Sequence, residues 1–479
     1  MGINKKNGVR IIQTGINRDV FPISKLEIEN IESNFYTIII GNNASGKSRL
    51  LVNILNGLRQ FANSRLKSKE ERVNIDLLIN SKSYNISDGK LAMHQELSEN
   101  INLISISNSL FDKFPHQAKS DKNYSYIGAR MTGIGTHKRG IVNDLMDVFS
   151  LNLHNETFVA KAKQLFKFLK IDPIIKISLR TSFSAGQIRF DDLLNNIKSI
   201  ESLKKYLIDI AQKGFYRQQS VILEKYANDS KFLEGFFNYL KIHSSQFSKD
   251  SKNAMQSLEI HLDSSSKNSI FIKEYKYFSL LRRLNILTYE YIKLQKDNVV
   301  YDILESSSGE IGLLITFLRA IPEMKSNSII FIDEPEISLH PSWQMKYIEL
   351  LRSFLKGYTG CHILIATHSH FLLSDLKEDW SSVLVLNNAY GKIKAELKQY
   401  TPYGWSPEAI LYEVFGVVNV RNHYFENDLR RMLSLISNRS ENLDQIQMYI
   451  KKFKQFKYTS GDPLNLIIKE AEIYVKKKK

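Results

Sequence analysis

The chain has 479 residues, 43% of them apolar, with a formal net charge of +16 and one cysteine, Cys361. The apolar content excludes a disordered chain, and a single cysteine excludes an internal disulfide or a multi-cysteine metal site. No stretch approaches the roughly 20 apolar residues that span a bilayer, and the first residues lack the apolar segment of a secretory signal, so we expect a soluble cytoplasmic protein without membrane contact.

The first predicted element is a strand, because NFYTIII at residues 34–40 is the continuous apolar run of a strand buried on both faces. GNNASGKS follows at residues 41–48, fits GxxxxGK[ST], and leads into an amphipathic run. Backbone N–H groups of such a loop bind phosphates, Lys47 would contact the β- and γ-phosphates, and Ser48 would ligate Mg²⁺. The expected ATP-contacting residues are Gly41, Asn42, Asn43, Ala44, Ser45, Gly46, Lys47, Ser48 and Arg49.

Residues 140–300 contain long amphipathic stretches, for example NETFVAKAKQLFKFLK at 155–170. They predict a mainly helical insertion between the two halves of the nucleotide fold. The insertion is too short and irregular for a long coiled-coil arm, which argues against a chromosome-maintenance ATPase.

A serine run, SSSGE at residues 306–310, stands directly before the apolar segment IGLLITFLRAI, which predicts a helix leading into the next strand. Hydroxyls and free N–H groups at a helix N-terminus form an anion site. Since the chain already has one phosphate-binding loop, the second anion is expected to be the ATP of a neighbouring copy. An ordinary N-cap with a capping-box glutamate is the alternative. The expected contacts are Ser307, Ser308, Gly309 and Glu310.

Two further strands are predicted to end beside the phosphate loop. SIIFIDEPEISLHP, residues 328–341, ends in two carboxylates, of which Asp333 would hold Mg²⁺ and Glu334 would act as general base. CHILIATHSHFLL, from Cys361, delivers His368 to the same edge, where it could bind the γ-phosphate and report hydrolysis. His370 is the alternative switch residue, and both histidines could instead be structural.

These motifs resemble those of ABC-type ATPases, in which a signature loop of one subunit closes over nucleotide bound by another. SSSGE stands where those proteins carry LSGGQ, while SFSAGQIRF at 182–190 looks more like LSGGQ but lies too far before Asp333 to lead into the acidic strand. The resemblance implies an α/β fold of the P-loop NTPase, ABC type, with a two-lobed nucleotide-binding domain. It also implies a Mg²⁺-sensing glutamine, for which Gln117 is the candidate, although a surface role is equally compatible.

The combined pattern resembles the OLD-like ATPases of bacterial anti-phage defence systems, in particular the PtuA subunits of Septu and of retron-associated systems, and next the AriA subunit of PARIS. The resemblance covers GNNASGKS, SSSGE, IDEPEISLHP and IATHSHFLL, and more weakly FDKFP, YIGAR, SPEAILYEVFGV and VRNHYFENDL. OLD nucleases also carry a Toprim domain with a DxD pair, and no DxD occurs in this sequence. The resemblance therefore implies a nuclease supplied by a separate HNH or Toprim subunit.

The resulting expectation is an ATPase, dependent on ATP and Mg²⁺, that forms a head-to-tail homodimer or higher homo-oligomer and controls that nuclease. The positive charge is compatible with DNA as a further partner, although the basic residues are spread along most of the chain. The rival functions are a DNA-repair clamp without a nuclease and the nucleotide-binding subunit of a transporter. The expected divisions are residues 1–139 for the N-terminal lobe, 140–300 for the insertion, 301–400 for the C-terminal lobe and 401–479 for a helical, partner-binding segment.

Overall fold

The structure is a computed structural model of the whole chain. It divides into two compact units, Met1–Gly404 and Trp405–Lys479, a boundary close to the one expected at residue 401. The residues that it describes are 7–17, 19–24, 31–62, 73–87, 90–91, 101–117, 121–128, 138–181, 190–212, 220–244, 256–263, 268–389, 392–398, 402–405, 409–411, 423–438, 442–455 and 464–478.

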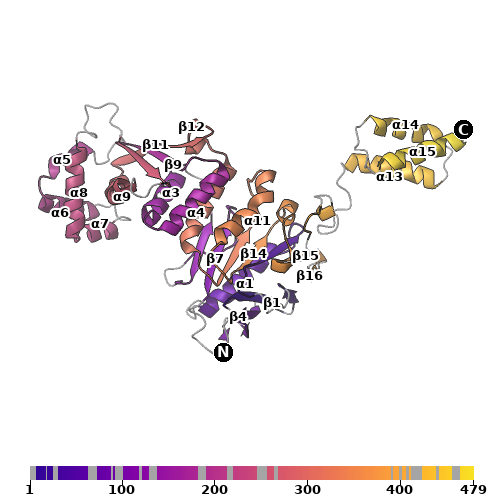
Figure 1. The fold of residues 1–479 in the computed structure, drawn as a ribbon, viewed down its shortest axis with the longest axis horizontal. Coiled ribbons are helices and arrows are strands. Elements are labelled where there is room, and N and C mark those ends of the chain that lie inside the picture. Colours follow the sequence, from indigo (N-terminus) through magenta and orange to yellow (C-terminus); the bar gives the residue numbers. More distant parts are fainter. Residues whose placement is uncertain are drawn as a thin grey trace. The chain divides into compact units, whose positions relative to one another are not determined.

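A seven-stranded sheet forms the centre of the first unit (Figure 1). Neighbouring strands are parallel except at one edge of the sheet, where β15 and β16 are antiparallel. The predicted strands before the phosphate loop, in the acidic motif and before His368 are its three adjacent central members, and each is buried along its whole length. In order across the sheet the strands are β16 (Lys392–Leu397), β15 (Ser381–Ala389), β3 (Phe35–Gly41), β14 (His362–Ala366), β13 (Ser328–Asp333), β7 (Asn102–Ser107) and β8 (Tyr124–Gly128).

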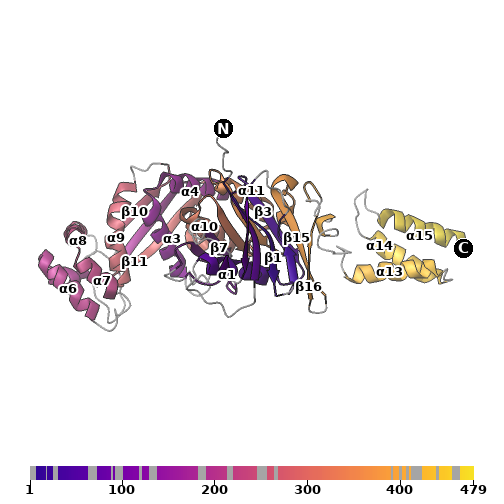
Figure 2. The same ribbon diagram turned by 90° about the horizontal axis from the view of Figure 1, so that it is seen from below.

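Helix α1 (Lys47–Ala62) packs between this sheet and a second, antiparallel one (Figure 1 and Figure 2). It contacts β3, β13 and β14 on one side and β4 and β5 on the other, and a single apolar core joins all three layers. This packing fixes the N-terminus of α1 at the carboxyl edge of β3. The second sheet has the order β2 (Asp19–Pro22), β1 (Val9–Ile16), β4 (Val73–Ile79), β5 (Lys82–Ser87) and β6 (Lys90–Leu91).

The insertion is only partly as expected, because it contains a four-stranded antiparallel sheet as well as helices. The strand order is β10 (Gln256–His261), β9 (Ile174–Thr181), β11 (Leu287–Lys296) and β12 (Val299–Asp302), and α9 contacts β10 and β11 (Figure 2). Pairing across such long sequence separations left no local hairpin signal around β9. The helices are α3 (Lys138–Asn152), α4 (Glu156–Leu169), α5 (Phe190–Asn196), α6 (Ile200–Gln212), α7 (Ser220–Ala227), α8 (Ser230–His243) and α9 (Ser269–Arg283).

The predicted helix after the serine run is α10 (Ser308–Ala320), which connects the insertion to the sheet. It packs on α3, α4 and β8, and Phe317 lies 4.7 Å between ring centroids from Phe354 of α11 (Pro341–Leu355). Helix α11 follows the acidic strand β13 and leads towards β14. The loops before α10 and α11 therefore both belong to the framework that carries the three central strands.

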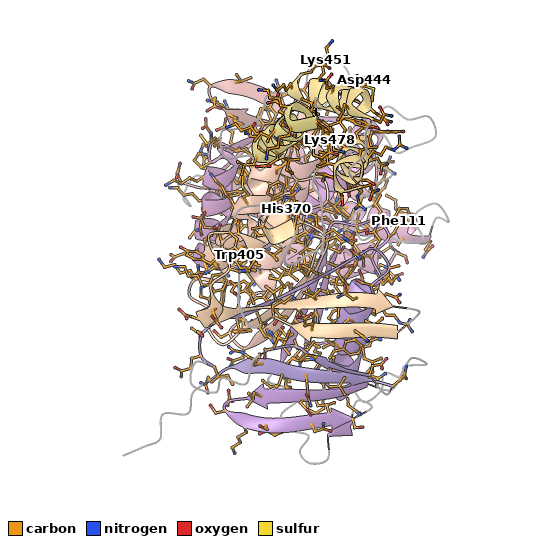
Figure 3. The ribbon with its side chains drawn as sticks, turned by 90° about the vertical axis from the view of Figure 1, so that its right-hand side faces the viewer. Phe111, His370, Trp405, Asp444, Lys451 and Lys478 are labelled. Carbon is orange, nitrogen blue, oxygen red and sulfur yellow. The ribbon has the colours of Figure 1, made fainter. Side chains whose placement is uncertain are left out.

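The second unit is a bundle of three helices, α13 (His423–Ser437), α14 (Leu443–Lys454) and α15 (Leu464–Lys478), drawn in yellow in Figure 1. Ile446, Tyr449, Ile450 and Phe453 recur at helical spacing along α14 and pack in the core that the three helices share. Lys451 and Lys478 lie on α14 and α15 (Figure 3). Within the described parts of both units, no helix combines the length and the apolar character needed to cross a membrane.

Candidate functional site

Three neighbouring parallel strands bring the predicted site residues to one edge of the central sheet. The register pairs Asp333 of β13 with Ala366 of β14, and Ala366 with Ile39 of β3, two residues before the end of that strand at Gly41. Because all three strands run in the same direction, their carboxyl ends and the loops that follow lie together. The phosphate loop, the acidic pair and His368 therefore converge on one place, as the sequence predicts.

The loop at residues 42–46 turns tightly and leaves its backbone accessible, as the close approach of phosphates requires. Gly46 has φ +92°, and a Cβ built there would lie 2.7 Å from the Ile393 side chain, so only glycine fits without strain. Asn388 of β15 donates to the carbonyl of Ala44 at 3.3 Å and supports the loop from the neighbouring strand. Asn42, Asn43, Ala44 and Arg49 are exposed, whereas Gly41, Ser45 and Lys47 are buried.

Lys47, the first residue of α1, directs its ammonium group back into the loop. Its Nζ donates to the carbonyls of Gly41 at 2.9 Å and Asn42 at 3.2 Å. Burial lowers the pKa of Lys47, and the negative charges of Glu334, Glu336 and Asp333 oppose that shift. A buried cation held by two neutral carbonyls and facing three acids is suited to binding the phosphate of a nucleotide.

Ser48 and Asp333 present two oxygen atoms of the kind that Mg²⁺ prefers. The Ser48 hydroxyl donates to Asp333 Oδ1 at 2.9 Å. The pKa of Asp333 is raised to about 7, mainly by burial and also by the charges of Glu334, Asp112 and Glu336, while the Ser48 hydrogen bond opposes the shift. Because a buried carboxylate among other acids is costly without a cation, these residues fit a divalent metal bound together with ATP.

Glu334 and His368 face each other above the loop. The distance from His368 Nε2 to Glu334 Oε1 is 3.8 Å, and His368 Nδ1 lies 3.5 Å from Lys47 Nζ. Burial and the adjacent Lys47 lower the pKa of His368, so the ring is neutral at physiological pH. Glu334 itself has φ +49°, a conformation that non-glycine residues adopt rarely and that concentrates at functional sites.

His370, the alternative switch residue, begins the short turn η6 (His370–Leu373). Its ring contacts that of Phe371, with 4.0 Å between centroids and 37° between the ring planes (Figure 3 labels His370). His368, in contrast, lies between Lys47 and Glu334. The geometry favours His368 as the residue that would contact the γ-phosphate.

The serine run forms an exposed helix N-terminus. Ser307 is the N-cap of α10, and its hydroxyl accepts from the Glu310 N–H at 3.2 Å. Ser307 and Ser308 are exposed, while Gly309 is buried against the backbone carbonyl of Ser338. The N-cap alternative is therefore real, yet it leaves the Ser308 hydroxyl and the tip of the helix open to a second molecule.

The expected role of Glu310 needs correction. Its carboxylate is paired with Lys296 of β11 at 3.0 Å and is largely buried, and its N–H is used by the Ser307 cap. Both groups are thus engaged within the chain. The ion pair ties the serine loop to the four-stranded sheet, and the side chain of Glu310 is not presented to nucleotide. The capping-box alternative is only half formed, because only the Ser307 side chain accepts a hydrogen bond.

Gln117 lies in the loop after β7, where it is exposed and donates to the carbonyl of Asp121 at 3.4 Å. Its role as a metal ligand stays a prediction. The residue of this loop whose charge acts on Asp333 is Asp112, which is buried and accepts from the Tyr126 hydroxyl at 2.7 Å. Sequence reasoning missed Asp112, although it lies in the FDKFP segment that was singled out.

A mainly apolar pocket lies along α10, between Ser308 and Arg319. It is lined by the loop after β7, by the end of β8, by α10 and by Ile337 and Ser338 of the turn after β13. Phe111 at this pocket is 90% exposed (Figure 3). The pocket adjoins the serine loop through Ser308 and is separate from the phosphate loop. The rejected segment at residues 182–190 lies, apart from Phe190, outside the described residues.

Comparison with known proteins agrees with this assignment at the level of the ATPase class. Residues 172–374 match a family model described as "AAA domain, putative AbiEii toxin, Type IV TA system", which covers the serine loop, the acidic strand and His368. Protein ea59 of Escherichia phage lambda is 30% identical over 113 residues, which is 23% of this chain and 21% of that protein. The chain thus matches about a fifth of the length of this relative.

Two solved structures resemble the chain at low overall similarity. The Smc head domain of Pyrococcus furiosus, bound to the C-terminal domain of ScpA, has 14% identity and a TM-score of 0.30, and the match covers 81% of this chain and 96% of that one. The recombination mediator protein RecF bound to a nucleotide has 13% identity and a TM-score of 0.28, with 82% and 100% covered. Together with the three-strand nucleotide edge, the family match supports an AAA-type P-loop ATPase domain in a mixed α/β fold.

Proposed function

We propose that the chain is the ATP-hydrolysing subunit of an anti-phage defence complex, and that two copies clamp head to tail around ATP and thereby control a nuclease supplied by a separate subunit. The proposal of a clamp rests on one observation. The chain has a complete phosphate loop around Lys47, and it also has a second, exposed helix N-terminus at Ser307 and Ser308. A second anion site on the surface is explained if it covers the nucleotide of another copy.

The chemistry follows from the side chains at the edge of the sheet. Lys47 and the loop N–H groups would hold the triphosphate, and Ser48 and Asp333 would hold Mg²⁺, which neutralises the charge that develops on the phosphate oxygens. Glu334 would take the proton of the attacking water. The neutral His368, between Lys47 and Glu334, would donate a hydrogen bond to the γ-phosphate and lose that contact after hydrolysis.

The nuclease partner rests on the family resemblance of the motifs and on the lack of a DxD pair in the sequence. We propose the three-helix unit, Trp405–Lys479, as the surface that binds the partner, because it has its own core and the nucleotide site does not need it. Co-expression with the product of the adjacent gene, followed by mass measurement of the purified complex, tests this part. An HNH or Toprim protein in the complex would support it.

The clamp is tested with two variants. Lys47→Ala removes the cation of the loop and should abolish ATP binding, whereas Glu334→Gln keeps binding but removes the base and should accumulate a nucleotide-bound dimer. Light scattering after size exclusion, with and without ATP, measures the dimer, and phosphate release measures turnover. Wild-type turnover by Glu334→Gln would contradict the assignment of the base.

The second candidate function is an ATP-driven clamp on DNA without a nuclease. The net charge of +16 favours it, because a basic protein attracts a polyanion. Salt-dependent DNA binding by the purified protein, together with the absence of any nuclease in the co-expressed complex, would favour this candidate over the first.

A further inference from the structure

A third acidic residue of the site, Glu336, has no role in the chemistry described so far. It lies two residues after Glu334, in the turn between β13 and α11. Both of its carboxylate oxygens are used by the loop that carries His368. Oε2 accepts from the Thr367 hydroxyl at 2.8 Å, and Oε1 accepts from the backbone N–H of His368 at 2.5 Å.

The loop that carries His368 also makes hydrogen bonds to β3 and to α11. Thr367 donates its N–H to the carbonyl of Ile39 in β3 at 3.0 Å, and its hydroxyl oxygen accepts from the Ser369 N–H at 2.9 Å. Ser369 in turn donates to Gln344 of α11 at 2.6 Å. The Glu336 carboxylate therefore belongs to a continuous hydrogen-bonded chain that runs from the acidic turn through the His368 loop to α11.

A carboxylate at this location is repelled by the other acids of the site, and a purely structural role does not explain why it is there. It lies close enough to Lys47 and Asp333 for its charge to act on both, in the same place where a nucleotide would add more negative charge. A neutral side chain would avoid that repulsion. A carboxylate, however, offers a separate oxygen to the hydroxyl and to the backbone N–H, and its charge makes both bonds stronger than bonds to a neutral acceptor.

We propose that Glu336 is a positioning residue for hydrolysis: by holding the His368 N–H and the Thr367 hydroxyl, it sets the His368 ring between Lys47 and Glu334. This inference rests on the proposed function. Glu336 does not touch the reacting atoms in this scheme. It fixes the backbone from which the ring of His368 reaches the γ-phosphate, so its loss affects the rate of the chemical step and leaves the binding of ATP intact.

Glu336→Gln is the direct test, because the amide has the same shape but a single acceptor oxygen. With its oxygen on the His368 N–H, its NH₂ group faces the Thr367 hydroxyl, which must then accept instead of donate, and both bonds lose the charge of the carboxylate. We expect kcat to fall about 10-fold, with KM and the Kd of a non-hydrolysable ATP analogue within about 2-fold of wild type. Glu396→Gln is the matched control and should behave as wild type, because it removes the same charge from an exposed glutamate on β16 that is paired with Lys398.

A double-variant cycle separates positioning from general damage. If Glu336 acts through His368, adding Glu336→Gln to His368→Ala should cause less than about a 2-fold further loss of kcat. Thr367→Val, which removes the hydroxyl donor, provides a second route if Glu336→Gln folds poorly. It should lower kcat in the same direction and be non-additive with His368→Ala.

The outcomes separate this inference from the proposed function. If wild type does not hydrolyse ATP, or if Lys47→Ala hydrolyses it normally, the proposed function fails and the inference fails with it. If wild type is active and His368→Ala is slow, but Glu336→Gln keeps full kcat or multiplies the His368→Ala defect, the inference alone is overturned. A lower unfolding temperature with unchanged kcat would likewise overturn it, because that is the signature of a structural role.

Discussion

Replacing Asp333 with asparagine is expected to stabilise the ligand-free protein at alkaline pH while removing its response to MgATP. Asp333 is 4% exposed, and burial with the surrounding acids raises its pKa to about 7 from 3.8. In the folded state the group therefore keeps its proton to higher pH than in the unfolded chain. Between these two values the folded state binds more protons, so stability falls as pH rises from about 4 through about 7.

The magnitude follows from the shift. About three pKa units at 1.36 kcal/mol each amount to roughly 4 kcal/mol, of which about 2 kcal/mol develops between pH 5.5 and pH 8. Asparagine removes the charge but keeps an oxygen that can accept the Ser48 hydroxyl, which donates to Asp333 Oδ1 at 2.9 Å. The variant should therefore lack the pH-dependent cost while keeping the local geometry.

Urea unfolding in EDTA, followed by tryptophan fluorescence, measures this difference. Trp343 and Trp380 lie in the unit that holds Asp333, and Trp405 is the first residue of the second unit. With Trp405 replaced by phenylalanine in both proteins, the signal reports on the unit that holds Asp333. The stability advantage of Asp333→Asn should widen by about 2 kcal/mol from pH 5.5 to pH 8. Asp379→Asn, an exposed aspartate, is the control. An advantage that does not change with pH, or a variant still stabilised by MgATP like wild type, would refute the reasoning.

Three further predictions concern residues that support the site. His362 is fully buried, its Nδ1 accepts from the Ile11 N–H at 3.0 Å, and burial lowers its pKa well below 6.5, so stability should fall by up to about 1.4 kcal/mol per pH unit below pH 6.5. His362→Asn should flatten that part of the urea-unfolding profile. Lys161→Met removes the donor to the carbonyls of Phe354 and Lys356 at the end of α11 and should cost about 2 kcal/mol of unfolding free energy, unlike exposed Lys163→Met. Lys296→Met leaves Glu310 buried without its partner and should weaken ATP-dependent dimerisation about 10-fold in light scattering, with ATP binding by the monomer unchanged.

The parts of the site that could be predicted from the sequence are those formed by residues adjacent in the chain. A parallel strand buried on both faces is a continuous apolar run, and β3, β13 and β14 are such runs. The order of strand, glycine loop and helix then fixes Lys47 and Ser48, and the common direction of the strands brings Asp333 and His368 to them. No knowledge of distant contacts is needed for this step.

The parts that the sequence did not predict depend on contacts between distant segments. Strand β9 pairs with β10, which begins 75 residues after β9 ends, and alternation over eight residues cannot reveal that partner. The role of Glu310 changed because Lys296, on another element, neutralises it. Asp112 and Glu336 are ordinary surface-type residues in the sequence, and only the packing of their loops against β8 and β14 makes them part of the site.

The turn after β13 gives a physical reason why the two ATP sites of a clamp would respond together. Its Glu336 holds the loop of His368, and His368 lies beside Lys47, where the chain would bind its own ATP. Three residues before α11, the carbonyl of Ser338 lies against Gly309, at the helix tip that would seal the ATP of the other copy, and no side chain fits between them. Because the turn is short and both of its ends make contacts, a shift of the His368 loop on hydrolysis would be passed on to the helix tip. Opening of one site would thereby loosen the seal on the other.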